Sequence, residues 1–181
     1  MSIYTGDTGE TDCLDGRKLL KSSVVIHFLG AVDELNSHLG LVKALAKTDA
    51  AGILNSCQFI ELIQKNLMKL MSHVSDCHNA VYFISDNDLN ILEEETEKLA
   101  HNTAAAAGFV IPGKNVIEAQ IHIARTAARR AERLFFTVVN DERALTPRQE
   151  DNLPVKTPLC PQAGCYLNRL SGYLFALSRQ A

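Results

Sequence analysis

Hydrophobic residues recur at steps of three and four along most of the chain, which is the spacing of helices that bury one face. Five stretches carry this spacing: one from about residue 25, one at 52–78, one from 85 or 86, one at 115–140 and one at 164–179. Ser85 or Asp86 can cap the third, since both side chains accept a hydrogen bond from a helix N-terminus. No stretch alternates with a period of two. The pattern therefore predicts an all-α fold, a five-helix bundle.

Two segments lack the helical spacing. Residues 1–24 are rich in glycine, aspartate, threonine and serine, which is typical of a loop. Residues 141–162 contain four prolines and are expected to form a connector between the last two helices. No composition change marks a domain boundary, so we expect a single domain over residues 1–181, with residues 1–24 as an N-terminal loop and 25–181 as the bundle.

Composition narrows the functional classes. The chain has 181 residues, of which 46% are hydrophobic and 22% charged, so it can bury a core and is not an intrinsically disordered chain. Its net charge of -3 argues against nucleic acid as a partner. No apolar run reaches the roughly 18 residues that span a bilayer, and the N-terminus lacks the features of a secretory signal. We expect a cytoplasmic protein with no membrane partner.

The cysteines and histidines indicate no metal site. The five cysteines form no CxxC pair, so neither a disulfide framework nor a zinc ribbon is expected, and reduced thiols are the simplest interpretation. His73 and Cys77 lie four residues apart, but they supply two ligands where a site needs three or four.

The stretch from residue 115 to 140 is the most informative. Its apolar residues fall within about 80° of one another on a helical wheel; they are Ile117, Ile121, Ala124, Ala128, Ala131 and Phe135. Small residues in the middle of this stripe let another helix approach closely. A polar stripe is turned about 100° from it; it comprises Glu118, His122, Arg125, Arg129, Glu132 and Arg133. Glu118, near the helix start, is explained by the helix dipole alone.

Four arginines crowd into nine residues of this helix, namely Arg125, Arg129, Arg130 and Arg133. Like charges at this spacing repel by a few tenths of a kcal/mol per pair, so something should offset them. One interpretation is a solvated basic stripe with Glu132 as a local ion-pair partner. The other is that the arginines meet an anion or a partner carboxylate, because the guanidinium group binds phosphate and carboxylate bidentately.

Two further segments carry candidate chemistry. The segment from Thr5 to Thr11 is spaced by glycines and rich in hydroxyls, which suits a phosphate-binding loop to which Lys21 could add charge, or else a flexible start. It contains no Walker A motif. The second segment is Asp33–Asn36. Its acids either interact favourably with the helix dipole near the helix start, or Asp33 is a partner for one of the arginines.

Five stretches of this chain together resemble the PduO-type family of ATP:cob(I)alamin adenosyltransferases. They occur in the family's order and span nearly the whole chain: IYTGDTGET at 3–11, GAVDELNS at 30–37, FVIPG at 109–113, RTAARRAER at 125–133 and YLNRLSGYLF at 166–175. The arginine block and the YLNRLS block are the most specific of the five.

This resemblance implies a five-helix bundle that assembles as a homotrimer and holds ATP at each subunit interface. It assigns the triphosphate loop to Thr5, Gly6, Thr11 and Lys21. It assigns further ATP contacts to Arg129, Arg130, Arg133 and Asn168. Arg125 would pair with Asp33 across the interface, and Glu132 would orient the nucleotide. Phe109 would press on the lower face of the corrin and exclude water from the cobalt.

The implied reaction explains why no nucleophilic triad is found. Cobalt(I) of reduced cobalamin attacks the 5′ carbon of ATP, which gives adenosylcobalamin and triphosphate, so the nucleophile belongs to the corrinoid. The protein must position ATP with its Mg²⁺, stabilise the leaving triphosphate and exclude water. A reductase or a cobalamin-dependent enzyme would be a further partner.

Three positions depart from the family pattern. The family usually has IYTKTGDKG where this chain has IYTGDTG, which is two residues shorter and lacks both lysines. Lys114 stands where a second glycine is common, and a family acid is replaced near His27. The alternative function is therefore a catalytically weak relative that binds a corrinoid or nucleotide as a carrier or partner module.

Overall fold

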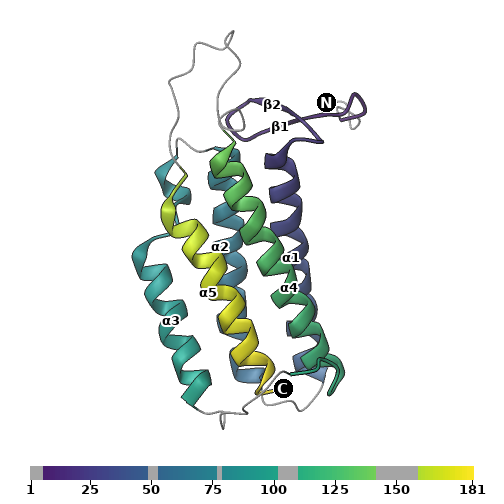
Figure 1. The fold of residues 1–181 in the computed structure, drawn as a ribbon, viewed down its shortest axis with the longest axis vertical. Coiled ribbons are helices and arrows are strands. Elements are labelled where there is room, and N and C mark those ends of the chain that lie inside the picture. Colours follow the sequence, from purple (N-terminus) through teal and green to yellow (C-terminus); the bar gives the residue numbers. More distant parts are fainter. Residues whose placement is uncertain (1–5, 49–52, 77–78, 102–109, 142–158) are drawn as a thin grey trace.

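The computed structural model describes residues 6–48, 53–76, 79–101, 110–141 and 159–181. Five long helices dominate these residues: α1 (Val24–Thr48), α2 (Cys57–Ser75), α3 (Asp86–His101), α4 (Val116–Asn140) and α5 (Pro161–Ser178). Two short 3-10 turns, η1 (Leu54–Ser56) and η2 (Ala80–Tyr82), precede α2 and α3. The helices lie side by side along the long axis (Figure 1), which confirms the predicted all-α bundle.

Composition had predicted that the N-terminal segment forms only a loop, but the structure also contains two strands there. Strands β1 (Glu10–Asp12) and β2 (Lys18–Leu20) form an antiparallel hairpin that pairs Thr11 with Leu19. The connecting turn is closed by a 2.8 Å hydrogen bond from the Cys13 N–H to the Arg17 carbonyl, and Gly16 adopts the φ of +83° that the turn requires. Strands of three residues are too short to show a two-residue alternation, so the prediction of loop alone was wrong.

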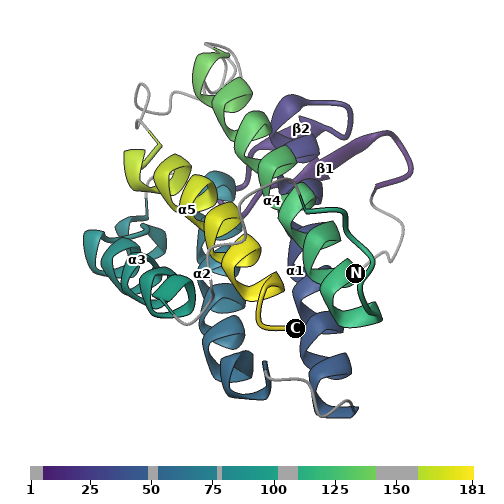
Figure 2. The ribbon, with the colours of Figure 1, turned by 60° about the horizontal axis from the view of Figure 1, so that its bottom comes forward.

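The core lies between α1, α2, α4 and α5. Every residue of the apolar stripe predicted on α4 is at most 2% exposed, which confirms that stripe. At the start of α5, a Cβ atom on Gly164 would come 3.0 Å from the ring of Phe135. The absence of a side chain at Gly164 therefore lets α5 pack closely against α4. Helix α3 packs on α5, on the side of the bundle away from α4 and the hairpin (Figure 2).

The helix ends follow local chemistry. Ser85 caps α3, since its hydroxyl accepts a 3.1 Å hydrogen bond from the Asp88 N–H, while the Asp88 carboxylate accepts from the Ser85 N–H at 2.9 Å. Helix α5 begins at Pro161, three residues before the predicted start at Gly164. Proline is favoured in a first turn because its missing N–H would have no partner there. The proline-rich connector therefore ends inside the helix that follows it.

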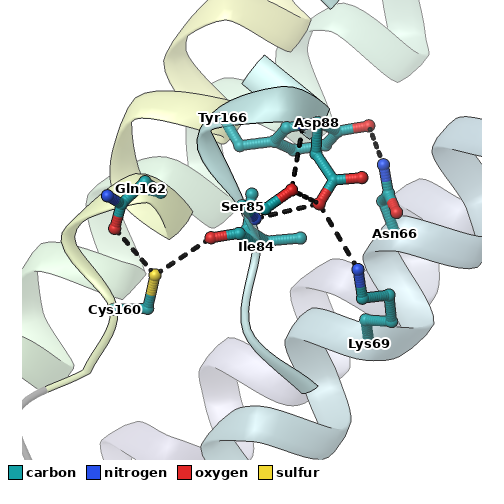
Figure 3. A network of polar contacts seen from close by, with 8 residues as sticks. All are labelled: Asn66, Lys69, Ile84, Ser85, Asp88, Cys160, Gln162 and Tyr166. Carbon is teal, nitrogen blue, oxygen red and sulfur yellow. Dashed lines mark hydrogen bonds and ion pairs between the residues drawn. The ribbon is translucent and has the colours of Figure 1, made fainter. Parts of the chain in front are cut away.

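A polar network holds the start of α5 against α2 and α3 (Figure 3). Tyr166 on α5 accepts a 3.3 Å hydrogen bond from Asn66 on α2, and the Cys160 thiol donates to the Ile84 carbonyl at 3.2 Å. Lys69 on α2 lies 3.4 Å from the Asp88 carboxylate on α3. These contacts fix the helix that carries Asn168.

None of the helices in the described part of the chain combines the length and the hydrophobicity that a membrane span requires.

Candidate functional site

A cavity of about 240 Å³ lies between α1 and α4, beside the arginine block. It is lined by Glu34, His38, Ile123, Thr126, Ala127, Arg130 and Arg133. A pocket that encloses a drug-sized ligand usually exceeds about 300 Å³. This cavity therefore matches one part of a larger ligand, or one wall of a site that another molecule completes.

The acid that lines this cavity is Glu34, the neighbour of Asp33 in the chain. Glu34 forms an ion pair with Arg130, and His38 Nε2 lies 3.8 Å from the other oxygen of the Glu34 carboxylate. Within the described part of the chain, the Asp33 carboxylate has no partner, although the Asp33 carbonyl accepts a hydrogen bond from Ser37. The spacing of Glu34 and His38, one helical turn apart, is the signal in the sequence that could have identified this pair.

The other arginines of the block carry uncompensated charge. Arg129 and Arg133 are exposed, and an Arg133 Nη1–H donates to the Arg129 carbonyl at 3.1 Å. Neither of them, nor Arg125, forms an ion pair with an acid in the described residues. Glu132 does not act as their local partner, because its Oε1 accepts a 2.8 Å hydrogen bond from Asn168 on α5. A row of guanidinium groups is thus left available to an anion.

The start of α4 corrects the predicted polar stripe. Glu118 and His122 are only 3% and 4% exposed, so they are buried and not part of a solvated face. The backbone just before the helix folds back over Glu118, and the N–H groups of Gly113 and Lys114 donate to its Oε2 at 2.6 and 3.1 Å. His122 Nδ1 in turn accepts a 3.2 Å hydrogen bond from the Nε–H of Arg125.

The electrostatics of Glu118 follow from these contacts. Burial by itself would raise the pKa of the Glu118 carboxyl. The two backbone N–H groups and the neighbouring His122 ring outweigh that effect and hold the pKa below its ordinary value. Glu118 is therefore a carboxylate at neutral pH, buried, with Oε2 bound by two N–H groups and Oε1 3.0 Å from His122 Nε2.

The N-terminal hairpin brings three predicted residues together. A second cavity, of about 280 Å³, is lined by Gly6, Glu10, Thr11, Asp12 and Lys21. The Lys21 ammonium donates a 2.7 Å hydrogen bond to the Gly6 carbonyl. The acids of this lining would repel a triphosphate unless a cation such as Mg²⁺ accompanied it.

The predicted site residues are thus distributed over two regions. Gly6, Thr11 and Lys21 lie at the hairpin, while the arginine block and the Glu132–Asn168 pair lie on α4 and α5. Two further predicted residues, Thr5 and Phe109, lie outside the described residues, as does Cys77. Groups of three or more potential metal ligands do not occur among the residues described.

Comparison with known proteins gives one consistent family. The family model described as cobalamin adenosyltransferase matches residues 1–181. A corrinoid adenosyltransferase of Citrobacter freundii is 33% identical over 183 residues, covering 98% of this chain and 93% of its own. A cobalamin adenosyltransferase of Cupriavidus metallidurans is 34% identical over 186 residues, covering 99% of this chain and 86% of its own.

Solved structures agree with the sequence comparison. A phenylalanine-to-histidine variant of the PduO-type ATP:corrinoid adenosyltransferase from Lactobacillus reuteri, complexed with cobalamin and ATP, matches with a TM-score of 0.81 and 26% identity. The match covers 99% of this chain and 90% of that one. An arginine-to-lysine variant of the enzyme from the same organism, complexed with ATP, matches with a TM-score of 0.79 and 26% identity over 99% of this chain and 92% of that one.

Proposed function

This chain belongs to the cobalamin adenosyltransferase family, and from that membership and its site we propose that it transfers the 5′-deoxyadenosyl group of ATP to the cobalt of reduced cob(I)alamin. The observation that carries this proposal is the arginine block of α4. Three of its four guanidinium groups have no acidic partner in the described residues, and two of the four line the cavity beside α1. An anionic ligand at this place would offset their mutual repulsion.

The reaction needs charge stabilisation more than it needs a protein nucleophile. The cobalt–carbon bond forms as the bond between the 5′ carbon and its oxygen breaks, and the electron pair leaves with triphosphate. We assign contacts with ATP to Arg129, Arg130, Arg133 and Asn168. Glu132 orients Asn168 through their 2.8 Å hydrogen bond. Guanidinium groups aimed at the leaving group stabilise charge that develops in the transition state.

The hairpin is the second part of the proposed ATP site. We assign the triphosphate tail, with Mg²⁺, to Thr5, Gly6, Thr11 and Lys21. The Lys21 ammonium already binds an oxygen of this loop, the Gly6 carbonyl, at 2.7 Å. A phosphate oxygen can replace or share that acceptor, because an ammonium group has three donors. The corrin-facing role of Phe109 comes from the family resemblance, and that residue lies outside the described ones.

A homotrimer is part of the proposal. Asp33 is exposed and Arg125 is half-buried, and within the described residues neither forms an ion pair. Each is therefore free to meet the other on a neighbouring copy, which is the pairing that the resemblance implies. The four cysteines of the described residues are free thiols, which supports a reducing, cytoplasmic location.

The test is an anaerobic assay with purified protein, ATP, Mg²⁺ and chemically reduced cobalamin. We expect loss of the cob(I)alamin absorbance together with formation of adenosylcobalamin and triphosphate. Arg129→Ala should abolish turnover with unchanged helical circular dichroism. Arg169→Ala is the matched control, because this exposed arginine of α5 pairs with Glu93 on α3, away from the arginine block. Absence of product from the unmodified protein would refute the proposal.

One observation favours a second candidate function. The loop is shorter than in the family, and its one predicted lysine, Lys21, is bound to the protein's own Gly6 carbonyl. A carrier that binds a corrinoid or nucleotide without efficient turnover would fit this arrangement. In the same assay, such a carrier would bind cobalamin tightly and yield no adenosylcobalamin.

A further inference from the structure

Between its N-terminus and the arginine block, α4 buries an acid and a histidine that lie one helical turn apart. The Glu118 and His122 side chains are each 4% exposed, and His122 Nε2 lies 3.0 Å from Glu118 Oε1. Burying such groups is costly unless they find partners. The proposed reaction uses neither of them directly, and the polarity of both would suit an exposed position on an amphipathic helix.

The contacts of His122 determine which ring nitrogen carries the proton. Arg125 Nε always bears a hydrogen and can only donate, and it lies 3.2 Å from His122 Nδ1. His122 Nδ1 must therefore be the unprotonated nitrogen that accepts. The proton of the neutral ring is then on Nε2, which faces the Glu118 carboxylate.

Both ends of this chain of contacts are held by the fold. Glu118 Oε2 accepts the N–H groups of Gly113 and Lys114, which leaves Oε1 to face His122. On the other side, the His122 ring meets the Phe175 ring edge-on, with centroids 6.4 Å apart, so α5 restricts rotation of the imidazole. The order of contacts is therefore backbone turn, carboxylate, imidazole, guanidinium.

We propose that Glu118 and His122 are positioning residues that fix the guanidinium group of Arg125 in the adenosyltransferase site. Glu118 selects the tautomer of His122, and that tautomer offers Nδ1 to Arg125. The proposal rests on the proposed function, since only there is Arg125 assigned to the site. It also explains why a carboxylate and an imidazole are buried in this helix.

The variant Glu118→Gln separates this role from simple packing. Its side-chain oxygen can keep the two N–H groups of the turn, which places the amide NH₂ toward His122. Nε2 must then accept, the ring proton moves to Nδ1, and Nδ1–H confronts Arg125 Nε–H. We therefore expect Glu118→Gln to expel Arg125 from this contact while shape and volume stay nearly unchanged.

The first measurement is ¹⁵N NMR on the full-length protein without substrates. In the unmodified protein, we expect His122 Nδ1 to resonate as an unprotonated nitrogen and the Arg125 Nε–H to exchange slowly with solvent. In Glu118→Gln, the proton should appear on Nδ1 and the Arg125 Nε–H should exchange fast. Glu94→Gln on the exposed face of α3 is the matched control and should change neither signal. A protonated Nδ1 in the unmodified protein would overturn the proposal.

The second measurement compares turnover of two variants at His122. His122→Asn keeps an acceptor near the Nδ1 position, whereas His122→Leu keeps the volume and removes the acceptor. We expect His122→Leu and Glu118→Gln to lose turnover by up to about a hundredfold, as for a site group misplaced by about 1 Å. His122→Asn should retain most of it. Turnover of His122→Leu equal to that of the unmodified protein would contradict the positioning role.

Two controls keep the outcomes distinct. Circular dichroism and thermal melting identify a variant that has not folded, and if His122→Leu fails this check, the comparison of His122→Asn with Glu118→Gln still decides. Should the unmodified protein show no turnover at all, the proposed function fails, whereas the NMR measurement still tests the contacts of Glu118 and His122 by itself.

Discussion

Glu34 on α1 forms an ion pair with Arg130 on α4, although the two residues are 96 positions apart in the chain. Their side chains are 49% and 44% exposed, so the pair lies at the mouth of the cavity between the two helices. Exposed ion pairs contribute only about 0–1 kcal/mol. A phosphate group can therefore compete for Arg130 at little cost.

The first prediction concerns Glu34→Gln. Removing this negative charge should raise the affinity for ATP by up to about fivefold, the factor that corresponds to about 1 kcal/mol at an exposed site. The melting temperature should change little, because an exposed pair is lost. Isothermal titration calorimetry with Mg-ATP measures the affinity, with Glu94→Gln on α3 as the control. A fall in affinity would instead mean that Glu34 holds Arg130 in its binding position.

A second prediction concerns Lys21 at the hairpin. Lys21→Met should weaken ATP binding by at least about tenfold, because hydrogen bonds to charged groups contribute about 1.5–3 kcal/mol. Lys18→Met is the matched control, since Lys18 is exposed at the start of β2, which ends one residue before Lys21, and lies outside the lining of the cavity. Equal ATP affinities of the two variants would remove the hairpin from the proposed site.

The third prediction tests the close packing of α4 and α5. Gly164→Ala should destabilise the fold by about 1–3 kcal/mol, because the new methyl group would lie 3.0 Å from the Phe135 ring. Gly172→Ala, on the same helix, meets no atom within 4 Å and should stabilise it by about 0.5–1 kcal/mol. Urea unfolding followed by circular dichroism measures both values. Changes of the same sign would argue against this packing.

The fourth prediction is a pH dependence that originates at Asp88. Burial would raise the pKa of the Asp88 carboxyl, but hydrogen bonds from Ser85 and the charge of Lys69 outweigh burial and lower the pKa. The unfolded chain therefore binds this proton more readily than the folded one. The resulting stabilisation is present above the unfolded pKa of about 3.9 and is lost as the pH falls through the lower, folded value.

The measurement is urea unfolding of the Asp88→Asn variant between about pH 2 and 6, around the unfolded pKa. Asp88→Asn should lose stability at pH 6 and show a flatter loss toward acid than the unmodified protein. Asp7→Asn, in the exposed N-terminal segment, serves as the control and should follow the unmodified curve. If the stability of Asp88→Asn falls with decreasing pH as steeply as that of the unmodified protein, the pH dependence originates from other carboxyl groups.

Long periodic segments were the most predictable part of this protein. The α4 stripe from Ile117 to Phe135 was identified correctly because a helix of this length repeats its buried face several times. Ser85, the cap of α3, was one of the two caps predicted, since capping depends on residues three positions apart. In contrast, the β1–β2 hairpin escaped prediction because its strands span three residues each.

The candidate site likewise has features that the sequence predicted and features that only the structure revealed. The spacing of residues along the sequence was enough to predict the helices, their buried faces and a row of arginines suited to bind an anion. Spacing alone did not determine which acid meets which base. Glu34 reached Arg130 because α1 packs against α4, and the backbone just before α4 folded back at Gly113 to bury Glu118 next to His122. Such pairings depend on the rotation of one helix against another and on where a loop folds back. Neither is encoded in the spacing of residues within a single helix.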